Sequence, residues 1–166
     1  NNMKFLILRL SNIIASPFSL RTKCWDLIAP NLCKQIAQEK KIFLKSSPDT
    51  LRDFVGMNQL NKFIKFYIDN LENFKSDLFN FTSSKTMTIF SLAEKLKLIN
   101  ERIFNESIDI LFDSKTKKNN VEPFLYSNKK VSSLGFKIDK TIDDELESTL
   151  MFCKLNFDCS RTNEKF

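Results

Sequence analysis

Apolar residues in this chain form short strand-like runs that alternate with longer stretches of helical spacing. A short apolar run of β-compatible residues, such as Phe5–Leu10, predicts a buried strand. Apolar residues that recur every three or four positions predict the helices between the strands, one of them capped by Thr86 or Thr88. The predicted strands are 5–10, 42–44, 78–81 and 108–112, and the predicted helices are 25–40, 59–71, a helix carrying the apolar residues from 90 to 99, and 141–154. This alternation predicts an α/β domain with a substantially parallel sheet.

Polar and proline positions indicate where some of these elements begin or end. Ser11–Thr22 contains Pro17 and several serines and predicts a loop. Pro30 marks either a kink in the first helix or its true start. Thr141 and Asp144 have the spacing of an acidic capping box, which predicts the start of the last helix.

Length and composition favour one folded domain. The chain has 166 residues, of which 42% are hydrophobic and 28% charged, and this excludes an intrinsically disordered protein. Seventeen Phe and only two Gly are unusual, and aromatic residues at regular spacing usually fill a core rather than mark a cofactor site. With no internal repeat and no long linker, we expect residues 1–166 to form a single domain.

The charge pattern gives little support to nucleic-acid binding. The net charge is +6, but lysines are interleaved with Asp and Glu in every segment, as on solvated helix faces. The tightest clusters are Lys40–Lys41 and Lys115–Lys118, and both are short. Nucleic-acid binding is therefore kept only as the third of three hypotheses.

Cysteine usage and hydropathy favour a cytoplasmic protein with no metal site. The four cysteines have no Cys-x-x-Cys spacing and the chain has no His, so a zinc site would lack its usual ligands. No apolar run reaches the roughly 20 residues that span a bilayer, and Lys4–Leu10 is too short for a signal-peptide core. Because the chain opens Asn-Asn-Met directly onto a strand-like run, we expect an upstream portion to be absent.

Four segments in the same order carry a resemblance to a known family. The most informative is Leu51–Leu98, in which Arg52-Asp53-Phe54-Val55 leads into a helix, an Asp-Leu-Phe-Asn strand, a Ser/Thr turn and a second helix. This order resembles the substrate-side half of the nucleotide-sugar epimerase/dehydratase branch of the extended short-chain dehydrogenases. The other matching segments are Leu8–Ile14 followed by Pro17, Ile42–Lys45, and Ser127–Lys137 with its Leu-Gly-Phe turn followed by the helix from Thr141.

The resemblance implies the fold and the place of this chain in a larger enzyme. It implies an α/β fold, the C-terminal part of a Rossmann-like extended short-chain dehydrogenase with its small substrate-binding subdomain. Residues 1–166 would then be the substrate-binding C-terminal half, and the N-terminal half that binds NAD or NADP would be absent. Enzymes of this family commonly pair as homodimers, although the helices that they use lie largely in the other half.

The resemblance also implies roles for four residues. Asn12 and Arg52 match residues that contact the nucleotide diphosphate, and Lys117 and Lys118 stand near the position of a further nucleotide-binding Arg. Each has a structural alternative: Asn12 could cap a turn, Arg52 could pair with Asp53, and the two lysines could simply be solvated.

The chain departs from the family pattern at several glycines. Ala15 stands where the family has a loop Gly, Ile14 replaces a Tyr, and Thr82–Ser84 replaces a Gly-x-Gly turn. Because Gly often serves positive φ or close backbone approach, these changes predict reshaped loops or a specialised substrate site.

The catalytic and cofactor motifs of such an enzyme are missing from this chain. With glycines only at 56 and 135, the Gly-rich dinucleotide turn cannot be present. Tyr126 and Lys130 have the spacing of the family's catalytic Tyr-x-x-x-Lys, but they follow the substrate-side motifs instead of preceding them, so we reject them as catalytic. The chain alone is expected to be inactive.

The leading hypothesis is therefore one part of an NAD(P)-dependent nucleotide-sugar epimerase or dehydratase, whose substrate this chain binds. The second hypothesis is a non-catalytic nucleotide-sugar-binding or scaffold module derived from that fold, which the absent glycines motivate. We expect no catalytic residue, no metal and no membrane partner in this chain.

Overall fold

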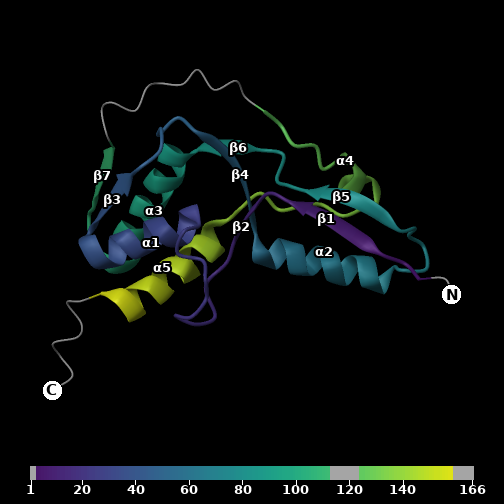
Figure 1. Ribbon diagram of the computed structural model, residues 1–166, viewed down its shortest axis with the longest axis horizontal. Helices are drawn as coiled ribbons and strands as arrows, with labels where there is room; N and C mark the ends of the chain where they lie inside the picture. The colour runs from purple at the N-terminus through teal and green to yellow at the C-terminus, as the bar shows by residue number, and fades with distance from the viewer. Residues whose placement is uncertain (1–2, 113–123, 159–166) are drawn as a thin grey trace.

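The computed structural model describes residues 3–112 and 124–158, in which strands and helices alternate along most of the chain (Figure 1). The strands pair in parallel in three of the four ladders, as the sequence predicts. The elements are β1 (Leu6–Leu10), β2 (Asn12–Ile14), α1 (Ile28–Glu39), β3 (Lys41–Leu44), β4 (Leu51–Gly56), α2 (Met57–Asp69), β5 (Asp77–Phe81), β6 (Thr86–Thr88), α3 (Ile89–Phe104), β7 (Asp109–Phe112), α4 (Lys129–Ser133) and α5 (Asp143–Phe157).

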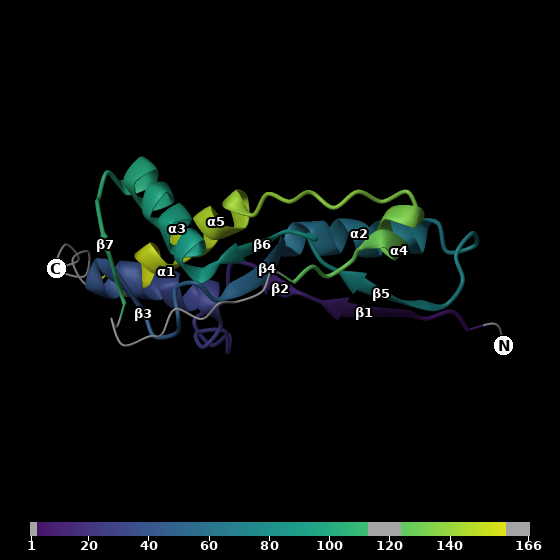
Figure 2. The ribbon, with the colours of Figure 1, turned by 90° about the horizontal axis from the view of Figure 1, so that it is seen from above.

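The strands form three small sheets. β1 pairs with β5 and β3 pairs with β7, each as a parallel two-stranded sheet. β4 lies between β2, to which it is parallel, and β6, to which it is antiparallel. The β2-β4-β6 sheet stands in the middle of the molecule and separates two groups of elements (Figures 1 and 2).

We name these two groups the helical lobe and the sheet lobe. The helical lobe contains α1, α3 and α5 with β3 and β7, and the sheet lobe contains α2 and α4 with β1 and β5 (Figure 2). Each lobe has its own apolar core. Because side chains alternate along a strand, the central sheet serves both cores: Ile14 and Phe54 belong to the helical lobe, and Val55 to the sheet lobe.

The core of the helical lobe is mainly aliphatic. Ile36 on α1, Leu92 on α3 and Leu150 on α5 are fully buried, and each helix presents one apolar face to the others, as the 3.6-residue spacing predicts. Burying one Leu or Ile side chain contributes about 1.5–3 kcal/mol, so each of these faces stabilises the lobe.

The core of the sheet lobe is aromatic. Phe63 on α2 packs against Phe81 and Phe79 of β5 with ring centroids 5.3 and 6.1 Å apart, and Phe136 reaches the same ring at 5.2 Å. Phe136 follows Gly135, whose φ of 90° lies in the left-handed region that favours glycine, and this confirms the predicted Leu-Gly-Phe turn.

Only one face of the β1–β5 sheet is covered. Leu6 and Leu8 face the aromatic core, whereas Ile7 on the opposite face is 47% exposed. Among the described residues β1 pairs with β5 alone, so its second edge is free. The prediction that Phe5–Leu10 forms a strand is confirmed, but the prediction that this strand is buried is wrong, because nothing in the described chain covers its outer face.

Other expectations about element ends have mixed outcomes. Thr88 caps α3 by accepting a hydrogen bond from the Ser91 N–H at 2.9 Å, which confirms one of the two predicted caps. The predicted loop from Ser11 instead begins with the short strand β2, because its N-terminal residues pair with β4.

The predicted capping box at the start of the last helix is wrong. Helix α5 begins after Ile142, and Thr141 donates hydrogen bonds to the Asp139 carboxylate instead. Pro30 lies in the first turn of α1, where its missing N–H costs nothing.

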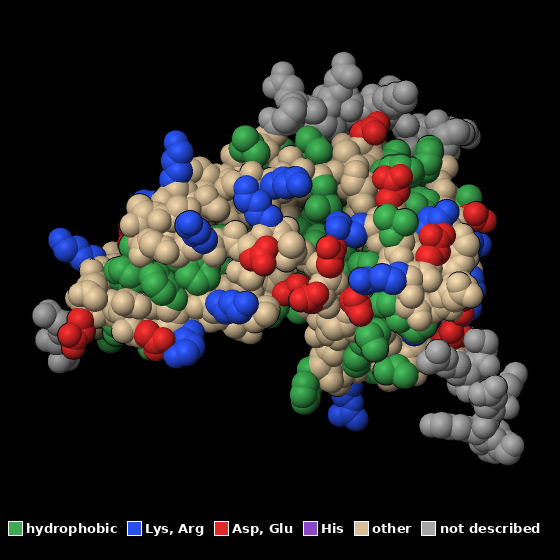
Figure 3. Space-filling view, turned by 180° about the vertical axis from the view of Figure 1, so that it is seen from behind, with side chains coloured by type: hydrophobic (Ala, Val, Ile, Leu, Met, Phe, Trp, Pro, Cys, Tyr) green, Lys and Arg blue, Asp and Glu red, His purple; other side chains and the backbone are tan. Residues whose placement is uncertain are grey.

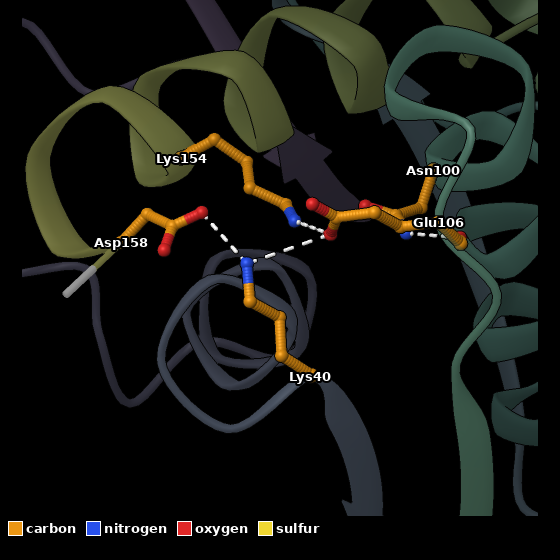
Figure 4. Close-up of polar contacts among 5 residues, drawn as sticks. All are labelled: Lys40, Asn100, Glu106, Lys154 and Asp158. Carbon is orange, nitrogen blue, oxygen red and sulfur yellow. Dashed lines mark hydrogen bonds and ion pairs between the residues drawn. The ribbon is translucent and has the colours of Figure 1, made fainter. Parts of the chain in front are cut away.

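An ion-pair cluster joins three elements at the far end of the helical lobe (Figure 4). The Lys154 ammonium, from α5, is 1% exposed and donates to the Glu106 carboxylate. Lys40, at the end of α1, donates to the Asp158 carboxylate at 2.7 Å and to Glu106 at 3.5 Å. The hydrogen bond from Lys154 lowers the pKa of Glu106, and burial lowers the pKa of Lys154.

Candidate functional site

The register of β2 and β4 brings Asn12 and Arg52 to the same face of the central sheet. Asn12 is the register partner of Phe54, and Arg52 lies two residues before Phe54 on the same strand. Residues two apart on a strand point to the same face, and diagonal neighbours on adjacent strands lie about 7–8 Å apart. Two residues that are distant in the sequence therefore form one candidate site.

Asn12 is held in place by its own amide. The Asn12 Nδ2 atom donates a hydrogen bond to the Asp53 carbonyl at 2.9 Å, which fixes β2 against β4. The Oδ1 atom and one N–H of the amide stay available to a ligand.

Arg52 is exposed and makes no ion pair with any described residue. Its guanidinium donates only to the neighbouring Leu51 carbonyl, at 2.9 Å. The alternative interpretation, an ion pair between Arg52 and Asp53, is wrong because the Asp53 side chain points to the opposite face of β4. Arg52 thus keeps most of its donors free for an anion.

Asp53 instead organises the turn that follows β5, a role that the sequence did not reveal. Its buried carboxylate accepts hydrogen bonds from the Ser83 N–H at 3.0 Å, the Ser83 hydroxyl at 2.8 Å and the Lys85 N–H at 3.1 Å. A buried carboxylate needs hydrogen-bond donors around it. An acidic residue directly before the apolar residues Phe54 and Val55 was therefore the signal in the sequence that such donors lie nearby.

The Thr82–Ser84 turn keeps a glycine-like backbone without glycine. Ser84 has φ of 55°, in the left-handed region that a side chain disfavours. Its hydroxyl donates to the Tyr126 carbonyl at 2.8 Å, and the Asn128 N–H donates to that hydroxyl at 3.3 Å. The Ser-rich turn is therefore tied to the segment before α4 by contacts that a glycine could not make.

A hollow of about 430 Å³ lies beside Asn12 at the carboxyl ends of β1 and β5. Ligands of parallel sheets commonly bind at this end of the strands. A second, mostly apolar hollow of about 290 Å³ adjoins Asn12 on the α1 side. The first hollow is lined by Arg9, Leu10, Ser11, Asn12, Asn80, Thr82 and Tyr126.

This architecture recurs in solved structures of nucleotide-sugar enzymes. The chain matches UDP-glucose-4-epimerase from Stenotrophomonas maltophila, with bound NAD, at a TM-score of 0.72 and 11% identity, covering 98% of this chain and 50% of that one. It matches UDP-N-acetylglucosamine 4-epimerase from Methanobrevibacter ruminantium, in complex with UDP-N-acetylmuramic acid, at 0.69 and 16% identity, covering 90% and 46%. It matches RMD from Pseudomonas aeruginosa, complexed with NADPH, at 0.67 and 19% identity, covering 90% and 48%.

The chain has the fold of one half of these proteins. This confirms the predicted α/β fold, which is that of about half of a Rossmann-like enzyme structure. It spans about half of the length of the structures that it matches. No family model and no curated protein matches the chain.

Two of the predicted site residues cannot be placed. Lys117 and Lys118 lie outside the described residues. The described part of the site is therefore Asn12 and Arg52, with the turn that Asp53 holds.

Tyr126 and Lys130 are not arranged as a Tyr-x-x-x-Lys pair on one helix. Tyr126 precedes α4, which begins at Lys129, so the two residues do not share a helix face. Lys130 donates to both oxygens of the Asp77 carboxylate at 2.7 and 2.9 Å and to the Leu78 carbonyl. These bonds lower the pKa of Asp77 and fasten α4 to β5.

Gly56 at the start of α2 resembles a phosphate-binding turn only in its strand-Gly-helix order. A Cβ atom built on Gly56 would lie 2.1 Å from the Glu145 Oε1 atom, and that oxygen accepts a hydrogen bond from the Asn58 N–H at 3.3 Å. A carboxylate already fills the space at this helix N-terminus and repels phosphate. The start of α2 therefore offers no fitting cradle for a dinucleotide.

Surface charge, helix hydropathy, potential metal ligands and cysteines add four further observations. On the face shown in Figure 3, Lys and Arg are mixed with Asp and Glu, without a stripe of one sign. Within residues 3–112 and 124–158, no helix is long and apolar enough to cross a bilayer, and no group of three or more potential ligands is placed to hold a metal ion. Three of the cysteines, Cys24, Cys33 and Cys153, are free thiols.

Proposed function

We propose that this chain is the substrate-binding C-terminal half of an NAD(P)-dependent nucleotide-sugar epimerase or dehydratase. In this proposal residues 1–166 are one domain, and the half that holds the cofactor precedes them in the complete protein. The observation that carries the proposal is the placement of Asn12 and Arg52, with unused donors, on one face of two paired strands in a fold that such enzymes share.

The two residues would bind the diphosphate of the nucleotide sugar. The planar guanidinium of Arg52 suits two phosphate oxygens at once, and the free N–H of Asn12 suits a third. Lys117 and Lys118 would add positive charge to the same group. Bound in this way the sugar ring is fixed in position, which supplies much of the rate when hydride must pass between two carbons.

The incomplete sheet lobe supports the idea of a missing half. β1 has a free edge and an uncovered face on which Ile7 is 47% exposed, and parallel sheets are normally covered on both faces. A preceding Rossmann half would extend the sheet along β1. NAD or NADP would bind to that half, because the residues present here offer no Gly-rich turn and Glu145 fills the space above Gly56. The cofactor supplies hydride chemistry when bound, and this chain alone would be inactive.

A ligand titration with a matched control tests the proposal. UDP-glucose and inorganic pyrophosphate are titrated against the chain by NMR, and we expect both to shift the signals of Asn12 and Arg52. Replacing Arg52→Ala should weaken binding about tenfold, the value of a charge-assisted hydrogen bond. The control Arg102→Ala also removes one exposed guanidinium, but Arg102 pairs with Glu147 on α5 and should leave binding unchanged. Equal effects of the two variants would contradict the proposed site.

Two other functions are separated from this one by further experiments. A scaffold module that kept the fold and lost the chemistry is favoured by the serine turn in place of glycines, and it predicts no catalytic gain when a cofactor-binding half is supplied in trans. A nucleic-acid-binding protein predicts salt-sensitive binding to any polynucleotide and none to UDP-glucose. We propose a cytoplasmic protein, since Cys24, Cys33 and Cys153 are free thiols.

A further inference from the structure

The loop between β2 and α1 projects from the helical lobe and carries a fully exposed aromatic side chain. Figure 1 shows this loop at the lower border of the molecule, level with the C-terminal end of α5. Pro17 is buried at the base of the loop, whereas Phe18, the next residue, is 100% exposed. The Thr22 N–H donates to the Ser19 carbonyl at 3.1 Å and closes a turn that places the exposed Leu20 at its tip. Phe18 therefore contributes nothing to the core of the chain.

Contacts at both ends of the loop hold it against α5. The Ser16 hydroxyl donates to the Ser148 carbonyl at 3.3 Å. The Trp25 ring stacks on Phe152 with ring centroids 6.3 Å apart. Because these contacts order the loop in advance, its tip loses little conformational entropy when it is bound.

The outer face of α5 extends the apolar surface of the loop. Met151 and Leu155 are exposed, and they follow Ser148 by three and seven residues. Residues at this spacing share one face of a helix, so both lie on the face that the base of the loop touches. We name this surface, formed by Phe18, Leu20, Met151 and Leu155, the loop–α5 surface. Exposed apolar residues that gather in one patch mark an interaction site, unlike residues exposed singly.

The charge of the loop selects an anionic partner. Arg21 and Lys23 stand beside the apolar tip, and neither makes an ion pair with a described residue. Residues 11–25 contain no acidic residue, Asp26 is the first carboxylate after the tip, and the acidic residues of α5 all precede Ser148. On the face shown in Figure 3, the projection at the lower edge of the molecule carries hydrophobic side chains and Lys or Arg, without Asp or Glu.

The shape of the surface favours a lipid bilayer over a folded protein. A folded partner needs a matching pocket for the projecting Phe18 ring, whereas lipid chains rearrange around it. Peripheral proteins bind anionic bilayers by inserting apolar side chains beside cations, and this needs no membrane-spanning helix. The cytoplasmic leaflet of a cell membrane carries such anionic lipids.

We propose that the loop–α5 surface docks on an anionic lipid bilayer. Phe18 and Leu20 enter the boundary between headgroups and acyl chains, and Arg21 and Lys23 contact the lipid phosphates. The inference is independent of the nucleotide-sugar proposal. It replaces the expectation of no membrane partner, which the lack of a spanning segment in the sequence had suggested.

Vesicle co-sedimentation of the full chain tests the docking surface. Vesicles of phosphatidylcholine and phosphatidylserine should bind the chain, and high salt should weaken this binding because it screens the cations. Vesicles of phosphatidylcholine alone should bind about tenfold more weakly. Phe18→Ala should weaken binding about tenfold and Arg21→Gln about fivefold. Both residues are exposed, so the variants should fold, which circular dichroism verifies.

The control variant and three outcomes make the test decisive. Leu98→Ala removes a 65% exposed side chain of α3, outside the loop–α5 surface, and should leave vesicle binding unchanged. Equal binding to both kinds of vesicle, or equal loss in Phe18→Ala and Leu98→Ala, overturns the proposal. Self-association without lipid that Phe18→Ala abolishes also overturns it, because the surface would then belong to a second copy. So does a changed affinity of Phe18→Ala for UDP-glucose, because the loop would then belong to the substrate site.

Discussion

The helical lobe and the sheet lobe bury their apolar residues in different ways. In the helical lobe three helices pack around β3 and β7, and its aliphatic core is closed by elements of the described chain. In the sheet lobe, α2 covers one face of β1 and β5 with aromatic rings while the other face carries the exposed Ile7. Because parallel sheets are normally covered on both faces, the difference predicts that the sheet lobe is the less stable of the two.

The candidate site lies at the boundary of the two lobes. Asn12 and Arg52 share the helical-lobe face of the central sheet, and Arg9 and Asn80 lie on the uncovered face of the sheet lobe. The proposed diphosphate residues therefore lie on the face of the central sheet that the complete lobe covers. Substitutions that separate the lobes energetically test this division.

The largest effect is expected from emptying the aromatic core of the sheet lobe. Phe63→Ala removes a fully buried ring that contacts β5 and the Phe136 turn, and should cost about 3–5 kcal/mol of unfolding free energy. Because the helical lobe has its own core, amide hydrogen exchange should rise in β1, β5 and α2 first, while α1, α3 and α5 keep their protection.

A control on the same helix makes this prediction specific. Ile68 on α2 is 61% exposed, so Ile68→Ala should change stability by less than about 0.5 kcal/mol. If Phe63→Ala instead raises exchange equally in both lobes, the two cores unfold as one cooperative unit and the comparison fails.

A smaller effect is expected from the ion-pair cluster of the helical lobe. Glu106→Gln leaves the buried Lys154 ammonium without its charged partner and should cost about 1–3 kcal/mol, reduced from the value of a fully buried pair because Glu106 is 41% exposed. Denaturant unfolding measures this cost. The matched control Lys65→Ala breaks the exposed Lys65–Asp69 pair of α2 and should cost less than about 0.5 kcal/mol.

The same cluster predicts a pH dependence. The pKa of Glu106 is lowered from 4.5, first by the hydrogen bond from Lys154 and also by the charges of Lys154 and Lys40. A carboxyl with a lowered pKa in the folded state contributes stability that is fully present above its unfolded pKa and is lost as pH falls through the folded pKa. Unfolding free energy should therefore fall as pH drops below about 4.5, and by less in Glu106→Gln.

The smallest effect is expected where the two lobes meet, at Gly56 and Glu145. Gly56→Ala places a methyl group against the Glu145 carboxylate, and the flexible side chain can move away only by giving up its bond to the Asn58 N–H. We expect a cost of about 1 kcal/mol, and a similar cost for Glu145→Ala, which removes the same cap of α2. The double variant should cost little more than either one, measured in a double-mutant cycle. Additive costs would show that the carboxylate does not cap α2.

Much of the secondary structure follows from local signals in the sequence. The patterns at 25–40 and 78–81 predict the helix found at Ile28–Glu39 and the strand found at Asp77–Phe81, because the 3.6- and 2-residue periods are properties of the backbone itself. Thr88 caps α3 for the same local reason. The capping box at Thr141 fails because the Asp139 carboxylate, two residues upstream, competes for the Thr141 N–H and hydroxyl.

The sequence by itself determined the α/β pattern, the resemblance to half of a nucleotide-sugar enzyme, and Asn12 and Arg52 as candidate residues. Only the tertiary structure decided that these two share a face, that Asp53 holds the serine turn instead of pairing with Arg52, and that Arg9 and Asn80 meet across β1 and β5. The physical reason is register: periodicity specifies which side of a strand a residue occupies, but strand pairing specifies which distant residue lies beside it.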